Sequence, residues 1–191
     1  VWVGLLVAGG AGLLVATYFL FPHVAERIDT FLDPGAGDTY QVERALEAFQ
    51  NGGLFGRGPG EGTVKDLLPD SHSDFIFAVA GEEFGLLVCL FLVLVFAFVV
   101  LRGFAKLLGE TNLFVLLAAT GLLTQVGLQA FVNMASALHL IPTKGMTLPF
   151  ISYGGSSLIA VALGMGFVLA LTRRRPQTVH VGPFAPEASY A

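Results

Sequence analysis

The sequence predicts an all-α fold, a polytopic membrane helix bundle with one large polar loop. Only 13% of the 191 residues are charged and 54% are hydrophobic, whereas a soluble domain usually carries about 25% charged residues. Apolar runs long enough to cross the hydrocarbon core of a bilayer recur along the chain. We expect four transmembrane helices, at residues 1–21, 75–101, 112–140 and 153–172.

The first run, residues 1–21, is apolar apart from Thr17, and Pro22 should end it. It starts at Val1, with neither a Met nor the basic start of a signal peptide. We therefore expect the chain to be the C-terminal part of a longer protein.

The polar region at residues 22–74 holds ten Asp or Glu and four Lys or Arg. Within it, residues 39–50 are expected to form a short amphipathic helix, with Asp38 or Thr39 as its N-cap. Its apolar face would lie on the bilayer surface or on the bundle. The residues of that face have the i, i+3, i+4, i+7 spacing of a helix: Val42, Ala45, Leu46 and Phe49.

A glycine-rich stretch follows at residues 56–62, where four of the seven residues are glycine. Glycine permits a positive φ and a close approach of the backbone to another group. Two interpretations stay open, a tight loop and a loop shaped to hold a ligand.

Lys and Arg residues in the short connections predict the orientation. They occur in the loop 102–111 and at the start of the tail 173–191. Short connections rich in Lys and Arg face the cytoplasm. Residues 22–74 and the loop 141–152 should then lie together on the opposite, extracytoplasmic side.

Asp74 stands where the polar region meets the second apolar run. One interpretation is structural, because Ser71-x-x-Asp74 fits a capping box for a helix that begins near Asp70. The other is catalytic, because burial at an apolar boundary raises the pKa of a carboxyl group toward neutrality, where it acts as a general base. The two are compatible, since a helix start would hold the carboxylate in place.

Lys144 lies in a proline-bearing loop between two spans. A lysine at this depth can extend its amine to the interface. It can also supply a point charge for a phosphate. Ser152 and Ser156 stand at the start of the last run, where free N–H groups of a helix can bind an anion. Close helix packing explains the neighbouring glycines equally well.

Polar residues also interrupt two of the apolar runs. Gln125, Gln129 and Asn133 recur every four residues, so they should face the bundle interior, either to bond between helices or to line a polar cavity. Glu82 and Glu83 are neighbours and diverge by about 100° on a helix. One could pair with a cation elsewhere in the protein, or carboxylates could hold Mg²⁺ or Mn²⁺, although no ligand spacing identifies a metal site.

Other function classes lack support in the sequence. There is no basic patch of the kind that binds nucleic acid. The chain has no Walker loop, no HExxH and no GxSxG in a strand–turn–helix context. Cys89 lies inside an apolar run and is interpreted as a small hydrophobic residue.

Three motifs in order resemble the SEDS family (shape, elongation, division and sporulation), and the resemblance covers about residues 1–175. The first motif is Pro-Asp-Ser-His-Ser-Asp-Phe-Ile-Phe-Ala at 69–78, followed by Gly-Glu-Glu-Phe-Gly at 81–85. The second is Pro-Thr-Lys-Gly-Met-Thr-Leu-Pro at 142–149, and the third is Ile-Ser-Tyr-Gly-Gly-Ser-Ser at 151–157. Within the family, the glycine loop and Pro-Asp-Ser-His favour the cell-division branch over the elongation branch.

The resemblance implies ten transmembrane helices, of which this chain would carry the last four. It implies a peptidoglycan glycosyltransferase that polymerises lipid II on the outer face of the bacterial cytoplasmic (inner) membrane, at the division septum, and releases undecaprenyl pyrophosphate. The family's essential acid matches Asp74 and its important lysine matches Lys144. Asp66 and His72 match further motif positions. The expected partners are a class B penicillin-binding protein and other divisome membrane proteins.

Two other functions are compatible with these residues. A lipid II flippase would use the polar stripe as a translocation path, although the chain shows no internal repeat of the kind common in transporters. A non-catalytic scaffold of the division machinery would use the spans as docking surfaces.

Overall fold

The computed structural model describes residues 2–32, 40–68, 70–142 and 145–173, and within these ranges every regular element is helical. The predicted all-α class is therefore confirmed. The elements in chain order are α1 (Trp2–Leu20), α2 (Pro22–Leu32), α3 (Tyr40–Gly52), the 3₁₀ helix η1 (Val64–Asp66), α4 (Ile76–Leu107), α5 (Leu113–Ala137) and α6 (Gly155–Leu171).

Three of the described helices, α1, α4 and α5, are long and apolar enough to cross a membrane. Helix α6 is equally apolar but has only 17 residues. At about 1.5 Å per residue it is about 25 Å long, close to the lower limit for crossing the hydrocarbon core. The protein is thus a membrane protein whose fourth predicted span is shorter than the 20 residues expected.

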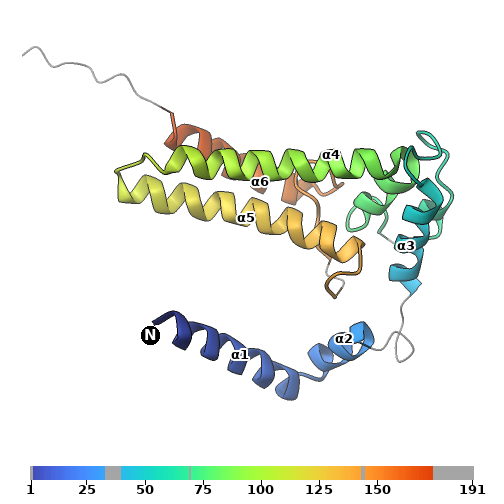
Figure 1. Ribbon diagram of the computed structural model, residues 1–191, viewed down its shortest axis with the longest axis horizontal. Helices are drawn as coiled ribbons and strands as arrows, with labels where there is room; N and C mark the ends of the chain where they lie inside the picture. The colour runs from blue at the N-terminus through green and yellow to red at the C-terminus, as the bar shows by residue number, and fades with distance from the viewer. Residues whose placement is uncertain (1, 33–39, 69, 143–144, 174–191) are drawn as a thin grey trace, which may run out of the picture.

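Helices α4, α5 and α6 lie side by side, and α1 lies apart from them (Figure 1). Buried side chains join α4 to α5 near one end of the bundle, among them Phe77, Cys89 and Ala130. A second cluster joins all three helices near the other end, where Leu107, Leu123 and Val168 meet. The described side chains of the first three turns of α1 are exposed, as expected of a helix that meets lipid or further helices.

The sequence analysis missed α2, which was expected to be part of the polar loop. Pro22 does not only end the first helix; it also begins the next one, because a proline at the first helical position loses no hydrogen bond and has the φ that a helix needs. Val24, Ile28 and Phe31 form a stripe along α2. The Phe31 ring contacts the ring of His139, beyond the end of α5, with the ring centroids 5.0 Å apart.

Helix α3 has the predicted apolar face, and its end is shifted by two residues to Gly52. The face packs on the bundle, because Ala45 and Ala48 are buried against Phe75 and Ala78 of the α4 entrance. The two candidate N-caps, Asp38 and Thr39, lie outside the described residues. At the far end of the bundle α4 runs on to Leu107, so Arg102 and Lys106 lie on its last turns and not in a loop.

Helix α4 is broken at Gly85, whose φ of 81° and ψ of 179° are not helical. The segment 53–58 fills the break. Its carbonyls at Gly53 and Leu54 accept from the N–H groups of Leu86 and Leu87, at 2.9 and 3.3 Å. In the other direction, the N–H groups of the next loop residues donate to the freed carbonyls of α4, both at 3.0 Å: Arg57 to Glu82 and Gly58 to Glu83.

This arrangement answers the question that the glycine-rich stretch left open. Its backbone packs against the backbone of α4, so it is a tight loop held by its own chain. A Cβ atom at Gly85 would collide with the backbone of Leu54 and Gly56. Backbone groups at membrane depth must be satisfied inside the protein, and here a loop supplies the partners that the broken helix lost.

Candidate functional site

The residues around Asp74 form a tight turn that leads into α4, not the first turn of a helix. The N–H groups of Ser73 and Asp74 both donate to the carbonyl of Asp70, at 3.1 and 3.0 Å. Asp70 itself has a φ of 55°, a conformation that Asp tolerates better than most residues. The helix begins at Ile76, and its N-cap Phe75 has no side-chain cap. The predicted capping box with a helix start near Asp70 is therefore wrong.

Asp74 is half-buried, and its burial raises the pKa of the carboxyl group above the ordinary value. The negative charge of Asp70 raises the pKa further, and a hydrogen bond from Ser73 lowers it. The loop that follows α5 lies directly against this carboxylate, because a Cβ atom placed on Gly145 would be 3.0 Å from Asp74 Oδ2. Asp74 is thus a carboxyl group of raised pKa that lies against the loop after α5.

A pocket of about 420 Å³ opens beside this turn. It is lined by His72 and Ile76, which flank Asp74 in the chain, and by Ile151, Ser152 and Tyr153. The two sides are joined, because the N–H of Tyr153 donates to the carbonyl of His72 at 2.9 Å. The structure thus brings together two of the predicted substrate-binding residues, His72 and Ser152.

The other predicted binding residues are not among those that line this pocket. Asp66 is exposed at the end of η1. Ser156 is exposed in the first turn of α6. Lys144 lies outside the described residues, so its role as a cation for a phosphate stays a prediction.

The partners of Glu82 and Glu83 lie in this chain. Glu82 is fully buried, and its carboxylate accepts hydrogen bonds from the N–H groups of Thr63, at 2.9 Å, and Val64, at 3.1 Å. Glu83 pairs with Lys65 at 2.7 Å, and that pairing raises the pKa of Lys65. Glu83 thus finds its cation, Lys65, within this chain and not in the rest of the protein.

These contacts also bear on a metal site. Glu82 and Glu83 were the carboxylates proposed to hold Mg²⁺ or Mn²⁺, and both are occupied by N–H groups or an ammonium group. Among the residues that the structure describes, no three His, Cys, Asp or Glu side chains gather as a metal site would require. Glu82 and Glu83 are therefore not free to hold the cation, and the divalent cation itself stays a prediction.

The polar stripe on α5 bonds to the loop 145–149. Gln129 Nε2 donates to the carbonyl of Thr147 at 2.9 Å. Asn133 Nδ2 donates to the carbonyls of Asp74, at 2.8 Å, and Met146, at 2.6 Å. Gln125, by contrast, is exposed. Of the two interpretations of the stripe, hydrogen bonding between elements is the one that Gln129 and Asn133 follow.

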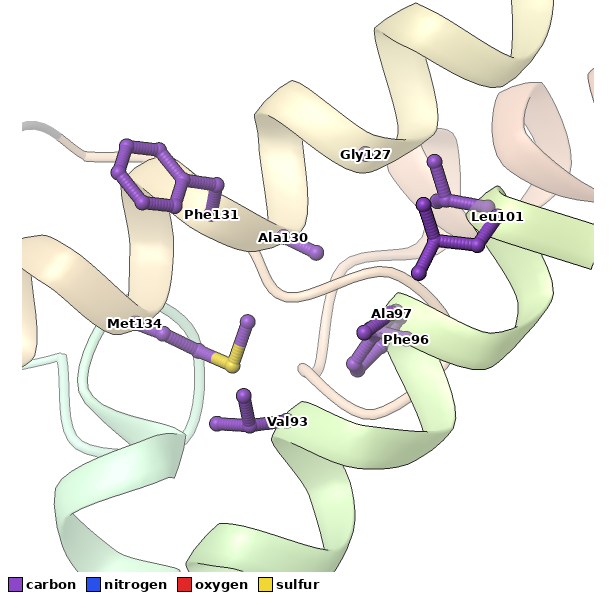
Figure 2. A pocket seen from close by; sticks show the side chains of 9 residues that line it. Val93, Phe96, Ala97, Leu101, Gly127, Ala130, Phe131 and Met134 are labelled. Carbon is purple, nitrogen blue, oxygen red and sulfur yellow. The ribbon is translucent and has the colours of Figure 1, made fainter. Parts of the chain in front are cut away.

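A second cavity, of about 320 Å³, lies between α4 and α5 (Figure 2). Figure 2 shows Val93, Phe96 and Ala97 on one side and Ala130 and Met134 on the other. Its nine lining residues are all apolar or glycine, so this cavity offers no group to a sugar or a phosphate. Of the two pockets described, the one beside the Asp74 turn is the one with polar lining residues.

Sequence reasoning missed Tyr153 and Gly145 as parts of the site. Tyr153 belongs to the third motif, but nothing in that motif marks it as a residue that lines the pocket. Gly145 shows its importance only through the closeness of Asp74 Oδ2, which depends on how two distant segments pack. The sequence identifies Asn133 as an inward-facing residue, but it does not show which groups accept its hydrogen bonds.

The chain is similar to proteins of one known family. The model of the FtsW/RodA/SpoVE family, described as cell cycle proteins, matches residues 1–177. A probable peptidoglycan glycosyltransferase FtsW of Caulobacter vibrioides is 55% identical over 170 residues, which cover 88% of this chain and 44% of the relative. The peptidoglycan glycosyltransferase RodA of Mycobacterium bovis is 38% identical over 181 residues, which cover 92% of this chain and 38% of the relative.

A similar chain is found in a solved structure. That structure concerns the coordination of polymerization and crosslinking by a peptidoglycan synthase complex. The TM-score is 0.67 at 31% identity, and the match covers 92% of this chain and 50% of that one. This chain spans less than half the length of the two curated relatives.

Proposed function

Because the chain belongs to the FtsW/RodA/SpoVE family, we propose that the full-length protein is a peptidoglycan glycosyltransferase that polymerises lipid II into glycan strands during bacterial cell division. The observation that carries the proposal is Asp74, a half-buried carboxyl group of raised pKa. It is not itself a lining residue of the pocket, but His72 and Ile76, two residues before and after it in the chain, are. Relatives named peptidoglycan glycosyltransferases support the reaction class.

In the proposed reaction, Asp74 is the general base. The 4-hydroxyl of one lipid II sugar attacks the anomeric carbon of another, and its proton passes to the Asp74 carboxylate. The new glycosidic C–O bond forms as the bond to the pyrophosphate breaks, which inverts the anomeric centre and releases undecaprenyl pyrophosphate. A general base of this kind contributes about 10²–10⁴-fold to the rate.

One residue would assist the departure of the pyrophosphate, and others would orient the substrate. Lys144 is the cation that the sequence predicts for this task. Ser152 and His72, which line the pocket, would orient the sugar head group. Asp66 and Ser156 are proposed as outer contacts of the same substrate. No step is assigned to Mg²⁺ or Mn²⁺, because the described carboxylates do not form a site for either.

We place the reaction at the outer face of the cytoplasmic membrane, at the division septum. The similarity to a chain of a peptidoglycan synthase complex supports a class B penicillin-binding protein as the partner. Other divisome membrane proteins would recruit the pair. The higher identity to an FtsW than to a RodA favours the division role.

Asp74→Asn in the full-length protein tests the proposal. We expect the polymerisation of purified lipid II in detergent to fall by at least about 100-fold, with folding and membrane insertion intact. Asp70→Asn is the matched control, because it makes the same exchange in the same turn at an exposed residue that Asn replaces without backbone strain. The control should keep its rate within about threefold, and a normal polymer yield from Asp74→Asn would refute the assignment.

The same assay separates the flippase and scaffold alternatives. A flippase needs two compartments, so polymer formation in detergent excludes flipping as the only activity. Two of the three amides that suggested a translocation path bond to the 145–149 loop, which favours the transferase. Support of cell division by the inactive Asp74 variant would favour the scaffold.

A further inference from the structure

Asn133 lies near the end of α5 and is almost fully buried, with 1% of its surface exposed. Its single amide nitrogen donates two hydrogen bonds to two different segments. One goes to the backbone carbonyl of Asp74 at 2.8 Å and the other to that of Met146 at 2.6 Å. No other contact described here ties the backbone of the Asp74 turn to the 145–149 loop.

The chemistry of the position admits few side chains. Both neighbours are carbonyl oxygens, so the group between them must donate two hydrogens from one atom, which an amide NH₂ does and a carboxylate or a single hydroxyl does not. The orientation of the amide is fixed for the same reason, since the opposite orientation would set oxygen against oxygen. The two acceptors therefore explain why an amide stands here.

We propose that Asn133 is a positioning residue for catalysis, which holds the Asp74 turn against the 145–149 loop and so sets the place of the Asp74 carboxylate. The inference rests on the proposed function, in which Asp74 is the general base. It goes beyond that function because the described hydrogen bonds of Asn133 go to backbone carbonyls and no substrate contact is assigned to it. Displacing a reacting group by about 1 Å costs about 10²-fold in rate.

Gln129, the neighbouring amide on α5, is the residue with which Asn133 can be compared. Gln129 stands one turn earlier on the same face of α5, fastens the same loop through Thr147, and also donates to Ser157 of α6. Its described bonds do not include the Asp74 turn. If Asn133 only attached the loop, its substitution should change kcat as little as substitution of Gln129 does. If Asn133 positions the Asp74 carboxylate, its substitution should lower kcat more.

The test compares Asn133→Asp with Gln129→Glu in the full-length protein, using purified lipid II in detergent. Both exchanges keep the shape of the side chain and replace the amide nitrogen by an oxygen. At Asn133 the oxygen faces two carbonyls, so we expect kcat to fall by about 10- to 100-fold with KM within about threefold. At Gln129 the new oxygen faces one carbonyl, that of Thr147, together with the hydroxyls of Thr147 and Ser157, which can turn to donate to it. None of these groups belongs to the Asp74 turn, so kcat should stay within about threefold.

Asn133→Ser guards against a variant that does not fold. It introduces no charge and keeps one donor, and its thermal unfolding in detergent is measured beside its kinetics. We expect a folded protein with kcat reduced and KM retained. A normal kcat in folded Asn133→Ser, or equal losses of kcat in Asn133→Asp and Gln129→Glu, would overturn the proposal.

Asp74→Asn in the same series tells the two failures apart. If Asp74→Asn polymerises lipid II normally, the proposed function fails, and the positioning role fails with it. If Asp74→Asn is inactive and the folded Asn133 variants turn over at the parent rate, only the positioning role fails.

Discussion

Glu82→Gln is expected to loosen the glycine loop while leaving the rest of the fold in place. The carboxylate of Glu82 is completely buried and accepts from the N–H groups of Thr63 and Val64. Val64 is itself only 2% exposed, so water cannot replace the lost acceptor. The perturbation therefore acts on a buried polar contact, where the cost of a missing partner is highest.

The magnitude follows from the individual bonds. A hydrogen bond to a charged group contributes about 1.5–3 kcal/mol, against about 0.5–1.5 for a neutral pair. The glutamine keeps one oxygen and so keeps neutral versions of these bonds, but its NH₂ group replaces Oε2, which accepts from Val64 N at 3.1 Å. We expect a loss of about 2–3 kcal/mol, equivalent to about 30- to 150-fold in the opening equilibrium of the loop.

Hydrogen exchange measures this opening directly. Mass spectrometry of the peptide that contains Thr63 and Val64 should show their amides exchanging about 30- to 150-fold faster, while the amides of α5 keep their rates. Glu83→Gln is the control, because it makes the same exchange one residue later, in a partly exposed pair with Lys65 expected to contribute at most about 1 kcal/mol. Parent-like exchange in Glu82→Gln, or equal acceleration in Glu83→Gln, would refute the assignment of Glu82 as the anchor.

Two further outcomes follow from the site and from the helix break. The pKa of Asp74 is raised in the folded protein, so its ionisation disfavours folding, and stability falls as the pH rises through that pKa. Asp74→Asn should therefore raise the thermal midpoint of the protein in detergent, and by more at pH 8 than at pH 4. Gly85→Ala should lower the midpoint, because a Cβ atom would meet the backbone of Leu54 and a φ of 81° alone costs about 1–3 kcal/mol. Gly109→Ala, which meets open space, should leave the midpoint unchanged.

The position of the site could be predicted because it lies at helix ends. The apolar runs place the start of each span to within two residues, although α4 runs six residues past its predicted end. Helix ends on the same side of a bundle should lie near one another. His72 and Ser152 come from segments 80 residues apart, yet both stand where a polar segment meets an apolar run, and they line one pocket. The same reasoning identified Asn133 as a residue that faces inward.

The details that the sequence could not supply all depend on long-range packing. Nothing local to Glu82 shows that its partners are two backbone N–H groups some 20 residues earlier. The capping box at Asp74 was wrong because Asp70 adopts a positive φ and turns the chain before the helix begins. The break at Gly85 stays invisible in an apolar run until the loop that fills it is known.

The break at Gly85 and the hydrogen bonds of Asn133 act on the two ends of the first segment of α4. The Asp74 turn leads into residues 76–84, which the glycine loop fastens at the break and which Asn133 ties at the turn. Neither anchor contacts the pocket, so each acts on Asp74 only through the backbone. A substitution in the loop 53–58 should therefore lower kcat, because it displaces the Asp74 carboxylate. Its effect on the affinity for the sugar head group should be smaller. The break frees the carbonyls of Glu82 and Glu83, and these are the groups to which the loop donates.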